Sequence, residues 1–228
     1  APVLVAGHSL GEFTALVAAG VLDFEEALLL VRERGRLMKE TGEQRPGGMA
    51  AVIGLDEQVL AAIVAEAGSE GIVSLANNNS PGQTVLSGEI AALQRAMDLA
   101  RAQGARLVQR LAVTIASHSP LMQQASQRFS HVVGQLTLRP PEVPLLSNVT
   151  AQALTSVDEL RHELSAQLIL PVQWTRSVQT AVAHGVDTFV ELGPRQVLSG
   201  LIKRISRNVQ SISLNDEALA KVMKDEGA

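Results

Sequence analysis

Residues 1–12 read APVLVAGHSLGE, and this stretch decides the expected fold. The first six residues are apolar and predict a buried strand, whereas the apolar spacing of residues 10–20 predicts a helix. Between them lies Gly7-x-Ser9-x-Gly11, a serine flanked by glycines in a tight strand-to-helix turn. Such a turn projects its serine at the carboxyl edge of a sheet. We interpret Ser9 as a nucleophile; the alternative is a glycine-rich turn without chemistry.

A serine nucleophile also needs an oxyanion donor and a base. The backbone N–H of Leu10 lies at the expected helix N-terminus, where it can face the oxyanion of a tetrahedral intermediate. The five histidines of the chain are His8, His118, His131, His162 and His184. Among them, His118 lies in a polar loop, residues 116–120, directly after a predicted strand, and catalytic groups favour such loops. We therefore expect His118 to accept the proton of Ser9.

Arg34 interrupts the apolar stripe of the helix predicted at residues 24–39. It follows Val31 by three residues and Ala27 by seven, so it lies on the same face of this helix as both. A guanidinium facing the core needs a carboxylate partner, because an unpaired buried charge is very costly. Two interpretations remain open. One is an internal ion pair, for example with Glu12, and the other is a binding group for a substrate carboxylate.

The order of the predicted strands and helices divides the chain into two expected domains. Residues 1–45 and 114–228 alternate between strands and helices, which predicts a large α/β domain with a mainly parallel sheet. Residues 46–113 predict the order βαββαβ, which is typical of a ferredoxin-like small domain inserted into the large one. A linker is expected at residues 41–48 and a turn-rich loop at residues 77–83. Because a central strand opens the sequence, we expect part of the large domain to lie upstream.

The composition excludes several function classes. The chain has 228 residues and a formal net charge of −4, which argues against a general nucleic-acid binder. It has no cysteine, which excludes disulfides, thiolate metal sites and a cysteine nucleophile, and which fits a reducing cytoplasmic location. It has no membrane-length apolar run, signal peptide, or metal, phosphate or dinucleotide fingerprint. We expect serine chemistry without a metal or cofactor.

A series of short motifs extends over nearly the whole chain. They are Gly7–Glu12, Arg34–Gly35, Gly48–Leu55, Asn79–Gln83, Ser117–His118, Pro171–Trp174, Glu191–Pro194 and Val197–Leu198. In identity and order they resemble the malonyl-CoA:acyl carrier protein transacylases and, more broadly, the acyltransferase domains of fatty acid and polyketide synthases. The resemblance implies an α/β-hydrolase-like large domain with a ferredoxin-like small domain. It also implies ping-pong transfer of a malonyl group from malonyl-CoA to acyl carrier protein.

The same resemblance implies a role for individual residues. Ser9 is then the nucleophile, and His118 is its general base and later its general acid. The backbone carbonyl of Gln167, in place of an aspartate, orients His118, and Arg34 holds the malonyl carboxylate. The expected lining of the pantetheine cleft is Asn77, Asn79 and Gln83. A basic patch for the acidic carrier protein is expected at Lys203, Arg204 and Arg207.

One family feature is expected outside the printed sequence. Family members carry a Gly-Gln-Gly-Ser-Gln segment upstream of the serine turn, and its glutamine supplies the second oxyanion N–H. Loss of one such donor costs ~10²–10³ in rate. We expect the family activity for the parent protein and a lower rate for this chain alone. The alternatives are an acyltransferase of a polyketide system, a serine thioesterase or hydrolase, and a non-catalytic interaction fragment.

Overall fold

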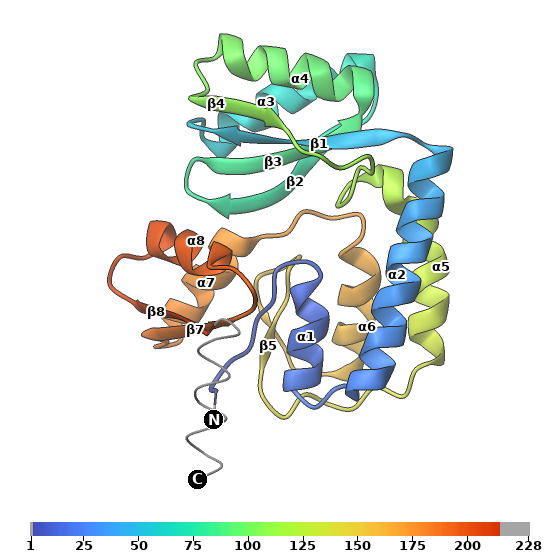
Figure 1. Cartoon of the computed structure of the whole chain (residues 1–228), viewed down its shortest axis with the longest axis vertical. Helices are drawn as coiled ribbons and strands as arrows, with labels where there is room; N and C mark the ends of the chain where they lie inside the picture. Colours follow the sequence, from blue (N-terminus) through green and yellow to red (C-terminus); the bar gives the residue numbers. More distant parts are fainter. Residues whose placement is uncertain (1, 215–228) are drawn as a thin grey trace. The chain divides into compact units, whose positions relative to one another are not determined.

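The structure is a computed structural model that describes residues 2–214 (Figure 1). The chain divides into two units, residues 1–177 and residues 178–228, and each is described by itself. The helix expected near residues 218–224 lies outside the described residues. No helix in the described range is long and apolar enough to cross a bilayer.

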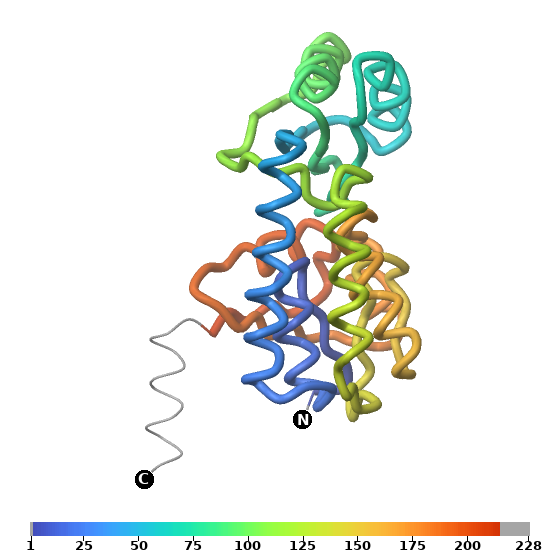
Figure 2. The backbone as a smooth tube through the Cα atoms, turned by 90° about the vertical axis from the view of Figure 1, so that its right-hand side faces the viewer, coloured from blue at the N-terminus to red at the C-terminus, as the bar shows by residue number. Residues whose placement is uncertain are grey.

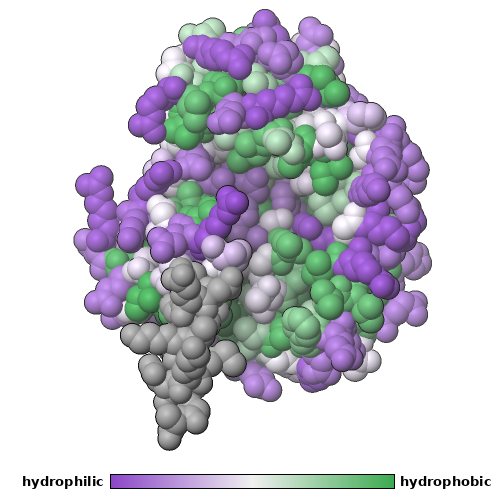
Figure 3. Space-filling view, viewed as in Figure 1, coloured by the Kyte–Doolittle hydropathy of each residue, from purple (hydrophilic) through white to green (hydrophobic). Residues whose placement is uncertain are grey.

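The serine turn leads into two helices, α1 (Gly11–Ala18) and α2 (Phe24–Gln44). α2 begins after Asp23, which forms a capping box with Glu26 and so satisfies free N–H groups of the first turn. The residues that α2 buries recur at helical spacing and are Ala27, Leu30, Arg34, Leu37, Met38, Thr41 and Gly42. Arg34 therefore lies on the buried face, as its spacing predicts. Apolar side chains also gather on the surface over α1 and the start of α2 (Figure 3).

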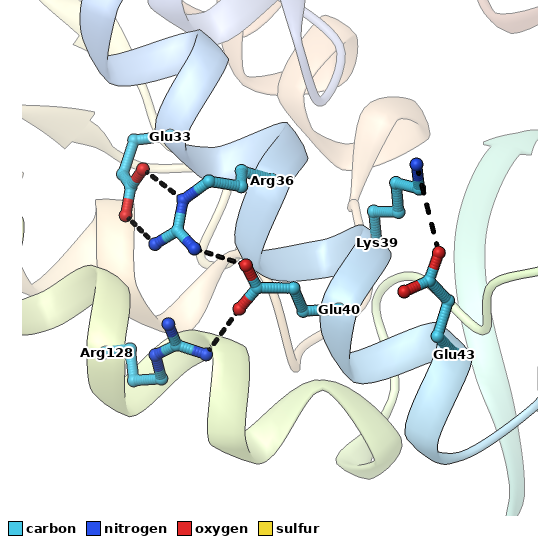
Figure 4. A network of polar contacts seen from close by, with 6 residues as sticks. All are labelled: Glu33, Arg36, Lys39, Glu40, Glu43 and Arg128. Carbon is cyan, nitrogen blue, oxygen red and sulfur yellow. Dashed lines mark hydrogen bonds and ion pairs between the residues drawn. The ribbon is translucent and has the colours of Figure 1, made fainter.

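α2 packs beside α5 (Gln123–Gln135), and α5 packs beside α6 (Val157–Ala166) (Figures 1 and 2). Phe13 and Phe129 meet edge to face in the core between the helices, with ring centroids 6.1 Å apart. On the surface, Arg36 contacts Glu33 and Glu40, and Arg128 of α5 lies 2.8 Å from Glu40 (Figure 4). Because these ion pairs are exposed, each contributes little to stability. The buried apolar cluster that includes both rings therefore contributes more to this packing than the surface ion pairs do.

The middle of the chain forms a four-stranded sheet with two helices. Its elements are β1 (Gly47–Ile53), α3 (Glu57–Ala67), η1 (Gly68–Glu70), β2 (Val73–Ser80), β3 (Gln83–Glu89), α4 (Ile90–Ala102) and β4 (Leu107–Arg110). The strand order is β2-β3-β1-β4, and all neighbouring strands are antiparallel. α3 and α4 cover one face of this sheet (Figure 1), where Leu60, Leu86 and Leu93 are fully buried.

Two expected loops are largely regular structure instead. The linker expected at residues 41–48 is wrong, because α2 continues to Gln44 and β1 begins at Gly47. Packing overrides the turn signal here: a Cβ at Gly42 would lie 2.3 Å from the Ile115 side chain, so a larger residue would require that side chain to shift. The loop expected at residues 77–83 is shorter than expected, because β2 extends to Ser80 and β3 begins at Gln83, which leaves a hairpin turn at residues 81–82. The edge of β2 is hydrogen-bonded to Val172.

Little sheet surrounds the serine turn in the first unit. η2 (Pro120–Met122) precedes α5, while β5 (Leu145–Leu146) and β6 (Ala153–Leu154) pair antiparallel. The strand expected at residues 1–6 is reduced to one parallel bridge between Val5 and Leu145. Val3 is 74% exposed, so the expected burial of this stretch is wrong. With one neighbouring chain segment among the described residues, the stretch cannot bury both of its faces.

The last elements are α7 (Trp174–Ala183), β7 (Thr188–Leu192), α8 (Val197–Ile205) and β8 (Gln210–Leu214). In the second unit, β7 and β8 are parallel and α8 connects them. The Glu191 carboxylate accepts the N–H groups of Leu198 and Ser199, 3.0 and 2.7 Å away. This motif glutamate therefore caps the N-terminus of α8.

Candidate active site

The turn that carries Ser9 is strained. Ser9 has a left-handed backbone with φ of 51°, a conformation that non-glycine residues adopt only where the surroundings enforce it. A Cβ at Gly7 would lie 2.0 Å from the carbonyl carbon and oxygen of Gly11, so only glycine fits at position 7. A Cβ at Gly11 would meet no atom within 4 Å in the described structure. The two glycines of the motif therefore differ: sterics demand Gly7 but not Gly11.

Ser9 is paired with His118, as its interpretation as a nucleophile requires. Ser9 Oγ lies 2.8 Å from His118 Nε2, and His118 Nδ1 lies 2.7 Å from the carbonyl oxygen of Gln167. Because a carbonyl only accepts, Nδ1 carries the hydrogen and the Nε2 lone pair faces the Ser9 hydroxyl. Burial and, secondarily, the nearby Arg34 guanidinium lower the pKa of His118 to about 3. The imidazole is thus neutral at neutral pH and can accept a proton.

Arg34 reaches the same hydroxyl from α2. Its Nη2 donates to Ser9 Oγ over 3.1 Å and to the side-chain oxygen of Gln167 over 2.9 Å. The guanidinium carbon lies 5.6 Å from the centre of the Phe13 ring. Burial lowers the pKa of Arg34 to about 10, so the group is still a cation at neutral pH. Its Nε has no hydrogen-bond partner within the described part of the chain, which leaves a buried donor for a ligand.

The expected Arg34–Glu12 ion pair is replaced by a relay through Gln167. The Gln167 side chain accepts from Arg34 through Oε1 and donates to Glu12 through Nε2. Nε2 also donates to the backbone oxygen of Ser9 over 3.1 Å. Gln167 therefore contacts the site in two ways, since its backbone carbonyl holds His118 and its side chain holds Arg34. The resemblance implied only the first of these contacts.

Asn148 is a site residue that the sequence analysis missed. Its Oδ1 accepts the Ser9 N–H over 2.7 Å, and its Nδ2 donates to the Gly7 carbonyl over 2.7 Å and to Glu12 over 2.8 Å. It therefore holds both sides of the strained turn. The available signal was its place two residues after the apolar pair Leu145–Leu146, where polar groups often line a site.

Of the other predicted site residues, Leu10 and Asn79 lie next to the serine turn, whereas Asn77 and Gln83 lie in strands β2 and β3. The Leu10 N–H, at the start of α1, has no hydrogen-bond acceptor among residues 2–214, which leaves it available to an oxyanion. Asn79 Oδ1 accepts from Nε2 of His8, the neighbour of Ser9, over 2.8 Å. Asn77 is buried in β2 and Gln83 opens β3. Between residues 2 and 214, no group of three His, Asp or Glu side chains could hold a metal.

Comparison with known proteins assigns the family. The model of a family described as "Acyl transferase domain" matches residues 1–227. The chain belongs to the acyl transferase family. The resemblance drawn from the motifs is thereby confirmed. Relatives of this acyltransferase include the malonyl CoA-acyl carrier protein transacylase of Escherichia coli K12, 43% identical over 216 residues, which are 95% of this chain and 70% of the relative. The Bacillus subtilis protein of the same name is 39% identical over 99% of this chain and 73% of its own length.

Solved structures resemble the acyltransferase over almost its whole length. The malonyl-CoA:acyl carrier protein transacylase of Xanthomonas oryzae superposes with a TM-score of 0.93 at 41% identity, over 98% of this chain and 72% of that one. A malonyl-transacylase solved in complex with a type II polyketide acyl carrier protein gives 0.94 at 40% identity, over 99% and 73%. At this identity the likeness shows the mixed α/β fold of these enzymes.

Proposed function

We propose that this acyltransferase transfers a malonyl group from malonyl-CoA to the phosphopantetheine thiol of acyl carrier protein through a malonyl ester on Ser9. One observation carries the proposal: a neutral imidazole and a buried guanidinium both contact the Ser9 hydroxyl. The imidazole suits acyl transfer through a serine. The guanidinium suits an acyl group that ends in a carboxylate, which a simple thioesterase does not require.

The first half-reaction loads Ser9. His118 Nε2 takes the hydroxyl proton while Oγ attacks the thioester carbonyl, and the Leu10 N–H donates to the resulting oxyanion. The C–S bond then breaks, and the CoA thiolate leaves with the proton that His118 returns. The Gln167 carbonyl keeps the ring in the required tautomer, because it holds the hydrogen on Nδ1.

The second half-reaction unloads Ser9 by the reverse steps. His118 accepts the proton of the pantetheine thiol, and the sulfur attacks the ester carbonyl. The C–O bond to Ser9 breaks, and the serine oxygen regains its proton from His118. Throughout, Arg34 binds the malonyl carboxylate with its free Nε and with the Nη2 that contacts Ser9 before substrate enters. In both half-reactions, His118 carries the proton between Ser9 and the sulfur of CoA or pantetheine.

We further propose a two-domain organisation and a cytoplasmic location. Residues 1–45 and 114–228 form the α/β-hydrolase-like domain, which the parallel β7–β8 pair and the Val5–Leu145 bridge support. Residues 46–113 form the ferredoxin-like domain, which the strand order β2-β3-β1-β4 supports. The cysteine-free sequence suits a reducing compartment.

Trapping the intermediate tests the function. After incubation with malonyl-CoA, intact-mass analysis is expected to show one malonyl group per chain, and the Ser9→Ala variant is expected to show none. Addition of holo acyl carrier protein should then remove the group and load the carrier. Release of free malonate without carrier loading would instead favour a thioesterase. Carriers from fatty acid and polyketide systems, assayed side by side, distinguish the two pathways.

A further inference from the structure

Two buried carboxyl groups lie behind the site, and the proposed chemistry uses neither. Glu12 of α1 is 0% exposed and Glu163 of α6 is 3% exposed. Burial and, after it, the charge of Glu163 raise the pKa of Glu12. The charged group that acts on Glu12 from α2 is Arg34, and it is separated from Glu12 by the Gln167 amide. Carboxyls without a direct cation are costly to bury, so this pair calls for a specific role.

Every hydrogen bond that Glu12 accepts from an amide leads to the site. One oxygen accepts the Asn148 backbone N–H over 3.0 Å and Asn148 Nδ2 over 2.8 Å, while the other accepts Gln167 Nε2. Both side-chain amides can be turned two ways, and the Glu12 oxygens, which accept from both amides, favour one of them. With its NH2 group on Glu12, Gln167 must present Oε1 to Arg34, and Asn148 must present Oδ1 to the Ser9 N–H.

We propose that Glu12 is the positioning residue of this site: it sets the direction of the Asn148 and Gln167 amides. The inference rests on the proposed function for its kinetic consequences and on geometry for the rest. Through Asn148, Glu12 holds the turn that presents Ser9. Through Gln167, it holds Arg34 where an acyl carboxylate can bind.

Glu163 is the second buried carboxyl group behind the site. Burial and the Glu163 charge keep the pKa of Glu12 well above its ordinary range. Glu163 itself accepts the Ser147 hydroxyl over 2.5 Å and the Val149 N–H over 3.1 Å, so these hydrogen bonds are separate from those of Glu12.

The Glu12→Gln variant separates positioning from mere support. Its single oxygen stays with the two Asn148 donors, so its NH2 group meets the NH2 group of Gln167. These donors repel, the Gln167 amide is displaced, and Arg34 loses its acceptor. We expect the ratio of kcat/KM for malonyl-CoA over acetyl-CoA to fall roughly tenfold, since a hydrogen bond to a charged group is lost. The matched control is Glu43→Gln, an exposed glutamate near the end of α2, for which both values should stay unchanged.

A second measurement tests the carboxyl pair without using activity. Because the folded pKa of Glu12 is raised, the folded chain binds more protons above pH 4.5 than the unfolded chain, and the free energy of unfolding falls as pH rises. Glu163→Gln removes the like charge, so this fall should weaken relative to the wild type in urea unfolding at several pH values. An unchanged pH dependence would show that the Glu163 charge does not act on Glu12.

The outcomes of the two experiments are distinguishable. Equal losses with malonyl-CoA and acetyl-CoA in Glu12→Gln would mean structural support only and would overturn the positioning role. If Glu12→Gln does not fold, the ratio of kcat/KM for malonyl-CoA over acetyl-CoA is measured in Glu163→Gln instead. A wild-type ratio is expected there, because Glu12 keeps both of its amide partners. A collapsed ratio would overturn the positioning role of Glu12. Failure of the proposed function shows in the wild type itself, which would then form no malonyl ester, while the unfolding data still decide on the pair.

Discussion

Ser9 and His118 hydrogen-bond over 2.8 Å although both residues have left-handed backbones, with φ of 51° and 57°. Neither is glycine, so each conformation costs free energy that other contacts must offset. The Asn148 side chain holds the turn at Ser9, and the Gln167 carbonyl holds the ring of His118. Strain at both partners of one hydrogen bond indicates a preorganised pair rather than an incidental contact.

The neutral state of His118 predicts how stability depends on pH. The folded pKa of His118 is about 3, and its ordinary value is 6.5. Between these two values the unfolded chain therefore binds a proton that the folded chain does not bind. The contribution is fully present above pH 6.5 and is lost as pH falls toward 3. Relative to the wild type, His118→Gln should therefore gain stability as pH falls, by up to about 1.4 kcal/mol per pH unit. Urea unfolding of both proteins at several pH values checks this, and parallel pH curves would contradict it.

Arg34 is expected to select the acyl group. Arg34→Ala removes the guanidinium, so kcat/KM for malonyl-CoA should fall about 100-fold while that for acetyl-CoA falls much less. The control is Arg36→Ala on the same helix, whose guanidinium is half exposed and contacts Glu33 and Glu40 on the surface (Figure 4). Steady-state kinetics with malonyl-CoA and acetyl-CoA measure this selectivity in both variants. Equal effects on the two substrates in Arg34→Ala would refute a carboxylate-binding role.

The two glycines of the turn are expected to tolerate alanine differently. Gly7→Ala places a Cβ 2.0 Å from the backbone of Gly11, so the turn must open, at a cost of about 3 kcal/mol in the free energy of unfolding. Gly11→Ala meets no described atom within 4 Å and should leave stability unchanged or raise it slightly. Denaturant unfolding of the two variants measures the contrast. Similar stabilities of Gly7→Ala and Gly11→Ala would show that the turn can accommodate a Cβ at position 7.

Asn148→Asp is expected to damage the turn. The aspartate keeps an acceptor for the Ser9 N–H but loses the donor to the Gly7 carbonyl and to Glu12. It also brings a further carboxyl group against Glu12. Stability should fall by about 2 kcal/mol, and malonyl loading of Ser9 should slow. Unfolding and the rate of adduct formation by mass spectrometry test both effects, and wild-type values for both would exclude a role for Asn148.

Carrier-protein docking is expected to depend on the basic end of α8. Lys203 and Arg204 are exposed in its last turn, and Arg207 follows on the surface. Reversal of the charge at Lys203 and Arg204 should raise the KM for acyl carrier protein at low salt and leave that for malonyl-CoA unchanged. Assays at low and high ionic strength measure this. An unchanged KM for acyl carrier protein at low salt would contradict a docking role for these residues.

Local patterns predicted the elements well where residues interact with near neighbours. The helical spacing that places Arg34 on a buried face and most strands and helices of residues 49–110 follow from such patterns. The linker predicted at residues 41–48 was wrong and the loop predicted at residues 77–83 was too long, because glycine, proline and asparagine suggested loops there. Close packing against Ile115 and strand pairing with Val172 decided those segments, and neither contact is visible in a local window.

The sequence by itself determined the strained turn, because the spacing of Gly7, Ser9 and Gly11 before an apolar helix permits little else. It also indicated His118 and Arg34, and the resemblance to a family then added Gln167 and chose between the two roles of Arg34. Only the tertiary structure decided the tautomer of His118, the relay from Arg34 to Glu12, and the parts played by Asn148 and Glu163. The reason is physical: the direction of a hydrogen bond depends on which atoms meet. Here they meet across 139 residues between Ser9 and Asn148 and across 155 between Gln167 and Glu12.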